Sequence, residues 1–132
     1  MSSAVHVLFV DRDPGILGTL KRVLALEPYV RSFCSSAVQA LTLVAAHDVD
    51  VVVTSHLLPG MNGLELLNVL RHERPWVQRL LLTGDPRGAW LGVDIVDHFI
   101  AKPWNNVALI DTLQRVVERA AVRRRARLTA AA

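Results

Sequence analysis

The sequence of 132 residues lacks the features that mark several large classes of protein. Cys34 is the only cysteine, which excludes an internal disulfide, and we expect its thiol to be a small buried hydrophobic group. No apolar run is long enough to cross a membrane, and the first residues lack the charged-then-apolar pattern of a secretory signal. Repeats and low-complexity stretches are also absent. These absences favour a single domain in a reducing compartment, and we expect the cytoplasm.

The apolar residues that are present suffice for one proper core, since they make up 52% of the chain while charged residues make up 20%. Three runs are almost entirely apolar, as in strands that are buried on both faces of a sheet: Val5–Val10, Val51–Thr54 and Leu80–Thr83. Two further runs, Tyr29–Phe33 and Ile95–Ile100, contain polar residues and fit the sheet edges. Because helical patterns separate these runs, the sequence predicts an α/β fold with a doubly wound, five-stranded parallel sheet in the order 2-1-3-4-5.

Polar residues that commonly cap helices stand before these helical patterns. Asp13 is expected to cap the first helix and Ser36 the second. A leucine-rich pattern after Gly63 marks the third helix, and the last helix is expected to begin after Asn105 or Asn106. The residues that this last helix should bury are Leu109, Leu113, Val116 and Ala120.

Four short motifs follow one another along the chain: an acidic cluster at Val10–Pro14, a loop at Leu57–Gly63, a strand with a hydroxyl residue at Leu80–Gly84, and Phe99–Trp104. Each is common by itself, but their order and separation resemble the receiver domain of response regulators. The resemblance extends from Val5 to about Glu118. It implies the flavodoxin-like (βα)5 receiver fold, in which ligands bind beyond the carboxyl ends of the strands.

The resemblance also implies a phosphorylation pocket in which carboxylates bind Mg²⁺ and an aspartate accepts the phosphoryl group. A hydroxyl residue and a lysine hold the phosphoryl oxygens in that family, and Thr83 and Lys102 match these positions. Asp11 matches the first acidic position, Arg12 stands at the second, and Ser55 stands at the acceptor position. By the same resemblance, the Lys102–Pro103 peptide is expected to be cis, which directs the lysine into the pocket.

Two of these residues remove the chemistry that the pocket needs. Ser55 is a poor nucleophile unless a base activates it, whereas a carboxylate can attack a phosphoryl donor directly. Arg12 places a cation where the family has a metal ligand, and Asp13 falls one place too far along and is explained as the helix cap. We therefore predict that Mg²⁺ binding and phosphorylation are lost. Arg12 either pairs with Asp11 inside the pocket or points into solvent as a surface arginine.

The segment between Thr83 and Phe99 is crowded with glycine and proline, which predicts a short or irregular fourth helix. The resemblance makes Phe99 the aromatic switch residue and places partner contacts on the fourth helix, fifth strand and fifth helix. Trp90 and Trp104 fall on or beside this face, where they serve either the core or an interface. We expect weak self-association as a dimer through it.

The sequence predicts a receiver-like domain at residues 1–120 and a basic helical extension or linker at residues 121–132. The favoured interpretation is a pseudo-receiver of a two-component system. It would bind a histidine kinase, an output domain or a second copy of itself, without enzymatic activity. The alternatives are a conventional receiver phosphorylated on an atypical residue, and a small nucleic-acid-binding protein that uses the basic tail. The second is less expected, because no aromatic residues are interleaved with the arginines.

Overall fold

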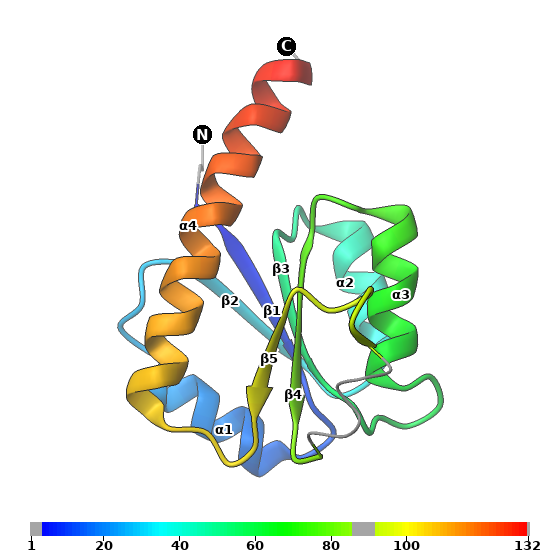
Figure 1. Ribbon diagram of the computed structural model, residues 1–132, viewed down its shortest axis with the longest axis vertical. Helices are drawn as coiled ribbons and strands as arrows, with labels where there is room; N and C mark the ends of the chain where they lie inside the picture. Colours follow the sequence, from blue (N-terminus) through cyan, green and yellow to red (C-terminus); the bar gives the residue numbers. More distant parts are fainter. Residues whose placement is uncertain (1–3, 86–91, 132) are drawn as a thin grey trace.

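The computed structural model describes residues 4–85 and 92–131 and contains one parallel sheet (Figure 1). Its strands are ordered β2-β1-β3-β4-β5, as the sequence predicted. All neighbouring strands pair in parallel, with Val7 opposite both Arg31 of β2 and Val51 of β3. The strand bounds are β1 (His6–Val10), β2 (Val30–Cys34), β3 (Val51–Ser55), β4 (Gln78–Thr83) and β5 (His98–Ala101).

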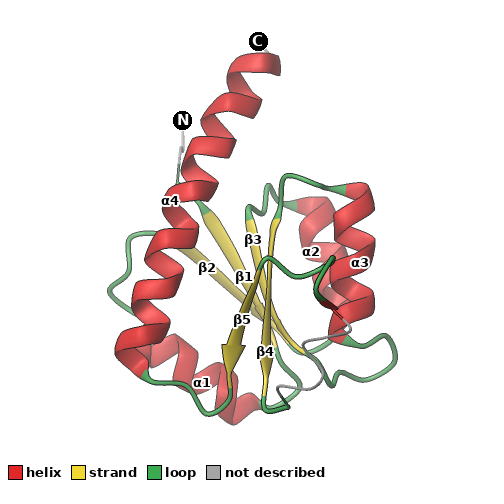
Figure 2. Cartoon of the chain, viewed as in Figure 1, coloured by secondary structure: helices red, strands yellow, loops and turns green. Residues whose placement is uncertain are grey.

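In the described residues, four helices cover the two faces of the sheet (Figure 2). They are α1 (Pro14–Val23), α2 (Ala37–Ala46), α3 (Gly63–Glu73) and α4 (Asn106–Ala131). One core packs α2 and α3 against side chains such as Leu8, Val52 and Leu81. The other packs α1 and α4 against Phe9 and Val53 on the opposite face. Strands whose alternate side chains enter two different cores must be apolar throughout, which explains the unbroken hydrophobic runs.

The helix ends follow the expected local chemistry. Asp13 accepts a hydrogen bond from the Gly15 N–H at 2.8 Å, and Ser36 accepts one from the Gln39 N–H at 3.2 Å. Asn62 and Glu65 form a reciprocal capping box at the start of α3. The four residues that the last helix was expected to bury are all buried in α4.

The connection between β4 and β5 lies partly outside the described residues, because residues 86–91 belong to it. In the described remainder, the N–H groups of Ile95 and Val96 both donate to the Gly92 carbonyl, at 2.9 and 2.8 Å. This is a single turn just before β5. The receiver resemblance places its fourth helix in this connection, so the helix labelled α4 here is the one that the resemblance counts as the fifth. In the described ranges, no helix is both long and apolar enough to cross a membrane.

Candidate functional site

A cavity of about 660 Å³ opens at the carboxyl ends of β1, β3 and β4. It brings together the residues that the sequence placed in a phosphorylation pocket, since all of them line its wall. These are Asp11, Arg12, Asp13, Ser55, Thr83 and Lys102. Strands that run in parallel end at the same edge of a sheet, so residues distant in sequence meet there.

Asp11 is buried at the wall of the cavity, and its carboxylate is fully hydrogen-bonded. Only 2% of the residue is exposed, and both of its carboxylate oxygens are engaged. Oδ1 accepts the N–H of Asp13 at 2.9 Å, and Oδ2 lies 2.7 Å from Nζ of Lys102. The ion pair therefore joins the end of β1 to the residue that follows β5.

Arg12 does not form the internal pair with Asp11 that was one of the two expectations. Its side chain is exposed at the wall of the cavity, and the described residues supply it with no hydrogen bond or ion pair. The physical reason is that Lys102 already neutralises the buried carboxylate, so Arg12 gains more from hydration. The surface-arginine alternative is the one that the structure shows. Asp13, as expected, is the cap of α1.

Ser55 ends β3 and is 3% exposed. Its hydroxyl donates to the carbonyl of Leu57 at 3.4 Å, a long bond to a group that is not a base. Thr83 is also turned toward main chain, because its hydroxyl accepts the N–H of Asp85 at 3.1 Å. Among the described residues, neither hydroxyl is hydrogen-bonded to a carboxylate or an imidazole, although His56 lines the same cavity.

The backbone at Ser55 is held by the start of α3. The N–H of Gly63 donates to the carbonyl of His56 at 2.7 Å, and a Cβ built on Gly63 would lie 2.0 Å from the Ser55 carbonyl oxygen. Only a glycine permits this approach. Gly63 therefore allows the start of α3 to pack closely against the end of β3, where Ser55 lies.

The Lys102–Pro103 peptide is cis, which confirms the prediction. The main-chain N–H of Lys102 donates to the carbonyl of Thr83 at 2.9 Å, continuing the pairing of β4 and β5. The lysine side chain points to Asp11 from there.

The residues expected on the signalling face are only partly described. Phe99 lies in β5 and is 38% exposed. Trp104 is half-buried, packs against the core beneath α4, and donates its indole N–H to Asn106 at 3.0 Å. Trp90 lies outside the described residues. Trp104 thus has a packing role of its own, and the contribution of these residues to an interface stays a prediction.

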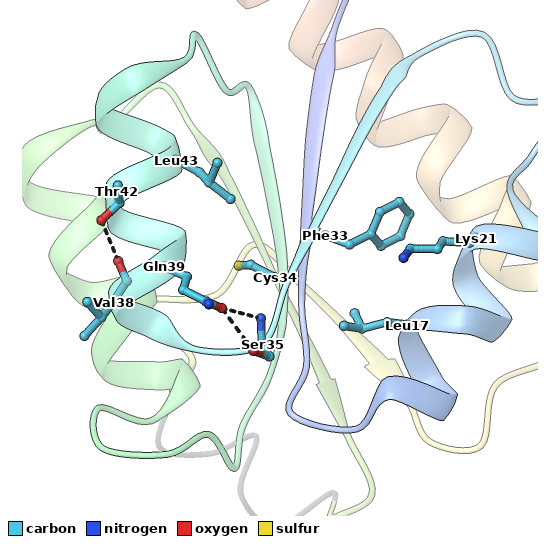
Figure 3. Close-up of a pocket in the computed structure, with 9 residues that line it drawn as sticks. All are labelled: Leu17, Lys21, Phe33, Cys34, Ser35, Val38, Gln39, Thr42 and Leu43. Atoms are coloured by element: carbon cyan, nitrogen blue, oxygen red, sulfur yellow. Dashed lines mark hydrogen bonds between the residues drawn. The ribbon is translucent and has the colours of Figure 1, made fainter.

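A second cavity, of about 570 Å³, lies along the edge strand β2 (Figure 3). Leu17, Lys21 and Phe33 lie on one side of this strand, and the side chains of α2 lie on the other. Lys21 Nζ stands 5.1 Å from the centre of the Phe33 ring. Cys34 is buried there, as expected, and burial raises the pKa of its thiol. An apolar groove with one cation holds no pair of groups for acid–base chemistry, so the cavity at the strand ends remains the candidate site.

Comparison with known proteins agrees with this geometry. Residues 7–114 match the family described as the response regulator receiver domain. The chain belongs to this family. It is similar to the transcriptional regulatory protein TcrA of Mycobacterium tuberculosis, with 32% identity over 127 residues that cover 92% of this chain and 49% of that protein. It is also 32% identical, over 108 residues, to the DNA-binding response regulator MtrA of Mycolicibacterium smegmatis.

Solved receiver structures show the same fold as this receiver domain. The signal receiver domain of an HD domain-containing protein from Pseudomonas fluorescens Pf-5 superposes with a TM-score of 0.84 at 32% identity, covering 89% of this chain and 97% of that one. The chemotaxis response regulator CheY4 of Vibrio cholerae gives 0.79 at 25% identity, covering 86% and 98%. The receiver spans about half the length of TcrA and MtrA, at 49% and 47%.

One group of charged residues was missed by the sequence reasoning. Asp48 and Asp50, before β3, form ion pairs with Arg124 and Arg127 near the end of α4. Arginines three apart on a helix lie on one face, which is a weak signal by itself. Nothing local in the sequence connects that face to two aspartates more than 70 positions earlier.

Proposed function

We propose that this receiver domain is a pseudo-receiver, an interaction module of a two-component system that works without aspartyl phosphorylation. The observation that carries the proposal is Ser55, which occupies the end of β3 where the family places its acceptor. The surrounding scaffold is retained around it, including the cis peptide after Lys102 and the close approach of Gly63. We infer that the fold is kept for binding and that the phosphoryl chemistry has been given up.

The hydroxyl at this position lacks the activation that phosphoryl transfer would require. A serine becomes a useful nucleophile when a neighbouring base takes its proton. The Ser55 hydroxyl donates instead to the carbonyl of Leu57. A main-chain carbonyl accepts a hydrogen bond but is too weak a base to remove the proton of the hydroxyl. This arrangement disfavours the alternative of a conventional receiver that is phosphorylated on an atypical residue, and it supports a domain without catalytic activity of its own.

The donor set of the cavity does not suit Mg²⁺. This ion demands near-octahedral coordination by oxygen ligands. Asp11 already shares one oxygen with Lys102 and the other with a main-chain N–H, while Asp13 is occupied in capping α1. No group of three or more metal-ligating side chains occurs in the ranges 4–85 and 92–131. We infer that Mg²⁺ binding is lost, because a metal would first have to displace the Lys102 ammonium from Asp11.

The partner is proposed to be a protein: a histidine kinase, an output domain or a second copy of the chain. The nucleic-acid alternative rests on six arginines of α4, namely Arg115, Arg119, Arg123, Arg124, Arg125 and Arg127. Arg115, Arg124 and Arg127 already have aspartate partners. An arginine that is neutralised within the protein contributes less to phosphate binding.

The test is incubation with acetyl phosphate and Mg²⁺ followed by intact-mass measurement. We expect no added phosphoryl mass on the unmodified protein. An Arg12→Asp/Ser55→Asp double variant restores the missing carboxylates, and we expect it to be labelled because Thr83 and Lys102 still line the cavity.

Two single variants decide what a positive result on the unmodified protein would mean. Labelling that disappears in Ser55→Ala would establish serine phosphorylation and overturn the proposal. Labelling that persists in Ser55→Ala would place the phosphoryl group elsewhere on the surface. Ser55→Asp alone separates the two losses, since it supplies the nucleophile and leaves Arg12 in place.

A further inference from the structure

The end of the sheet opposite the candidate site carries a second cluster of charged residues. Asp48 follows α2, and Asp50 immediately precedes β3, so both lie at the end where this strand begins. Asp50 is 3% exposed, which is rare for a carboxylate without a partner. Its Oδ2 accepts the main-chain N–H of His6 at 2.9 Å, which ties it to the start of β1.

The partners of these carboxylates come from the last turns of α4. Arg124 Nη1 lies 2.6 Å from Asp48 Oδ2 and 3.2 Å from Asp50 Oδ1. Arg127 Nη2 lies 3.1 Å from Asp48 Oδ1 and 3.8 Å from Asp50 Oδ1. Two cations therefore balance two anions at one place. We call these four residues the C-terminal ion-pair cluster.

A third segment completes the contact. The Arg127 guanidinium carbon stands 4.9 Å from the centre of the Trp76 ring, in the loop between α3 and β4. Arg123 reaches the carbonyl of the same tryptophan at 3.5 Å. The basic end of α4 is thus held by two loops, the one that precedes β3 and the one that precedes β4.

The guanidinium of Arg124 is well shielded, because only 11% of its side chain is exposed. Burial by itself lowers the pKa of Arg124, but Asp50 and Asp48 outweigh it and raise the pKa above its ordinary value. The ion pair of Arg124 with Asp50 is therefore shielded from solvent, which would weaken an exposed pair.

We propose that Asp48 and Asp50 form a docking site for the arginine-rich end of α4, which makes residues 121–130 part of the folded domain and fixes the direction in which this helix leaves the sheet. The helix starts four residues after Lys102, which is held by Asp11 at the other end of the sheet. Buried aspartates thus anchor the C-terminal segment at both ends. Such a site lets the domain present whatever follows α4 in one orientation, without a phosphoryl group. The proposal places no domain boundary at residue 120.

The test is hydrogen–deuterium exchange of the full chain, comparing Arg124→Gln with Arg125→Gln. The two variants remove the same charge from adjacent positions, but Arg125 is exposed and has no ion pair among the described residues. We expect amides of residues 121–130 to exchange at least tenfold faster in Arg124→Gln, and within twofold of the unmodified protein in Arg125→Gln. Equal rates for these amides in the two variants would overturn the proposal.

The amides of Val52 and Val53 in β3 serve as the internal reference, because both residues are fully buried in the core. If Arg124→Gln speeds their exchange as much as that of α4, the whole domain has unfolded. Asp48→Asn then decides, since half of the Asp48 side chain is exposed and Asp50 is left in place. We expect at least threefold faster exchange at residues 121–130 in this variant, with β3 unchanged. No difference from Arg125→Gln would contradict the docking site.

Discussion

Lys102 Nζ lies 2.7 Å from Asp11 Oδ2, which joins two residues that are 91 positions apart. The side chain of Asp11 is 3% exposed and that of Lys102 is 25% exposed, so the carboxylate depends on the ammonium more than the reverse. Asp11 and Lys102, the two charged residues of the family's pocket that this chain has, therefore neutralise each other. The energetic role of this pair can be measured.

Replacing Lys102 with methionine should lower the free energy of unfolding by about 2–3 kcal/mol. The change keeps most of the apolar stem and leaves the buried Asp11 carboxylate without its cation, which is the costly outcome for a buried pair. The partial exposure of Lys102 keeps the expected loss below the value for a fully buried pair. Urea denaturation followed by circular dichroism measures it.

The control uses a pair that is exposed on α4. Arg115 and Asp111 lie 3.1 Å apart with 67% and 61% of their side chains exposed, so Arg115→Gln should cost at most about 0.5 kcal/mol. An Asp11→Asn/Lys102→Met double variant should recover at least half of the loss in Lys102→Met. If the double variant is the less stable of the two, the pair does not act as described.

Gly63→Ala should destabilise the domain by about 1–3 kcal/mol. The new methyl group would lie 2.0 Å from the Ser55 carbonyl oxygen, and main chain cannot rotate away as a flexible side chain can. Gly18→Ala is the matched control, because its nearest contact is the end of the Arg22 side chain at 3.5 Å. In a helix interior this change should stabilise by about 0.5–1 kcal/mol. Equal stabilities of the two variants in urea would refute the constraint at Gly63.

The single tyrosine provides a pH prediction. Tyr29 is 5% exposed, and its hydroxyl has no hydrogen-bond partner in the described part of the chain. Burial, reinforced by Glu27, raises the pKa of Tyr29 from 10.0 to about 12. Because the folded-state pKa is raised, the stability from this group is complete below about pH 10 and is lost as the pH rises through 12.

Ultraviolet absorbance of the tyrosinate checks this directly, since the chain has one tyrosine. We expect its midpoint near pH 12, or together with alkaline unfolding if that comes first. Tyr29→Phe should be as stable as the unmodified protein or up to about 1 kcal/mol more stable, because it removes a buried unsatisfied hydroxyl. A midpoint at pH 10 in a protein that is still folded by circular dichroism would contradict the burial of this group.

The features predicted correctly from the sequence are those that depend on neighbouring residues. Strand order followed from the contrast between apolar runs and the interrupted run at Tyr29–Phe33, which became the edge strand β2. The caps at Asp13 and Ser36 followed from side chains that reach only two or three positions along the chain. These interactions are local, and so is the information that specifies them.

The choice of ion-pair partners could not be predicted in the same way. For Asp11, the sequence offered only its neighbour Arg12 as a partner, with a surface position of Arg12 as the alternative. The structure pairs Asp11 with Lys102, because adjacent residues at a strand end point in different directions. Lys102 follows β5 and reaches Asp11 at the end of β1, although β3 and β4 lie between these two strands. Asp50 and Arg124 pose the same problem at the other end of the sheet, where the partner depends on how far α4 continues.

The uninterrupted length of α4 gives the C-terminal ion-pair cluster a mechanical meaning. The helix covers about 27 Å between Asn106 and Arg124 at a rise of about 1.5 Å per residue. Its first turn lies near the candidate site and would be the pivot of any tilt of the helix against the sheet. A tilt of about 5° at the pivot would carry the Arg124 end through roughly 2 Å. That displacement is enough to break the 2.6 Å contact with Asp48. The contact between Arg124 and Asp48 therefore resists small tilts of α4, and the helix keeps one orientation while the C-terminal ion-pair cluster is formed.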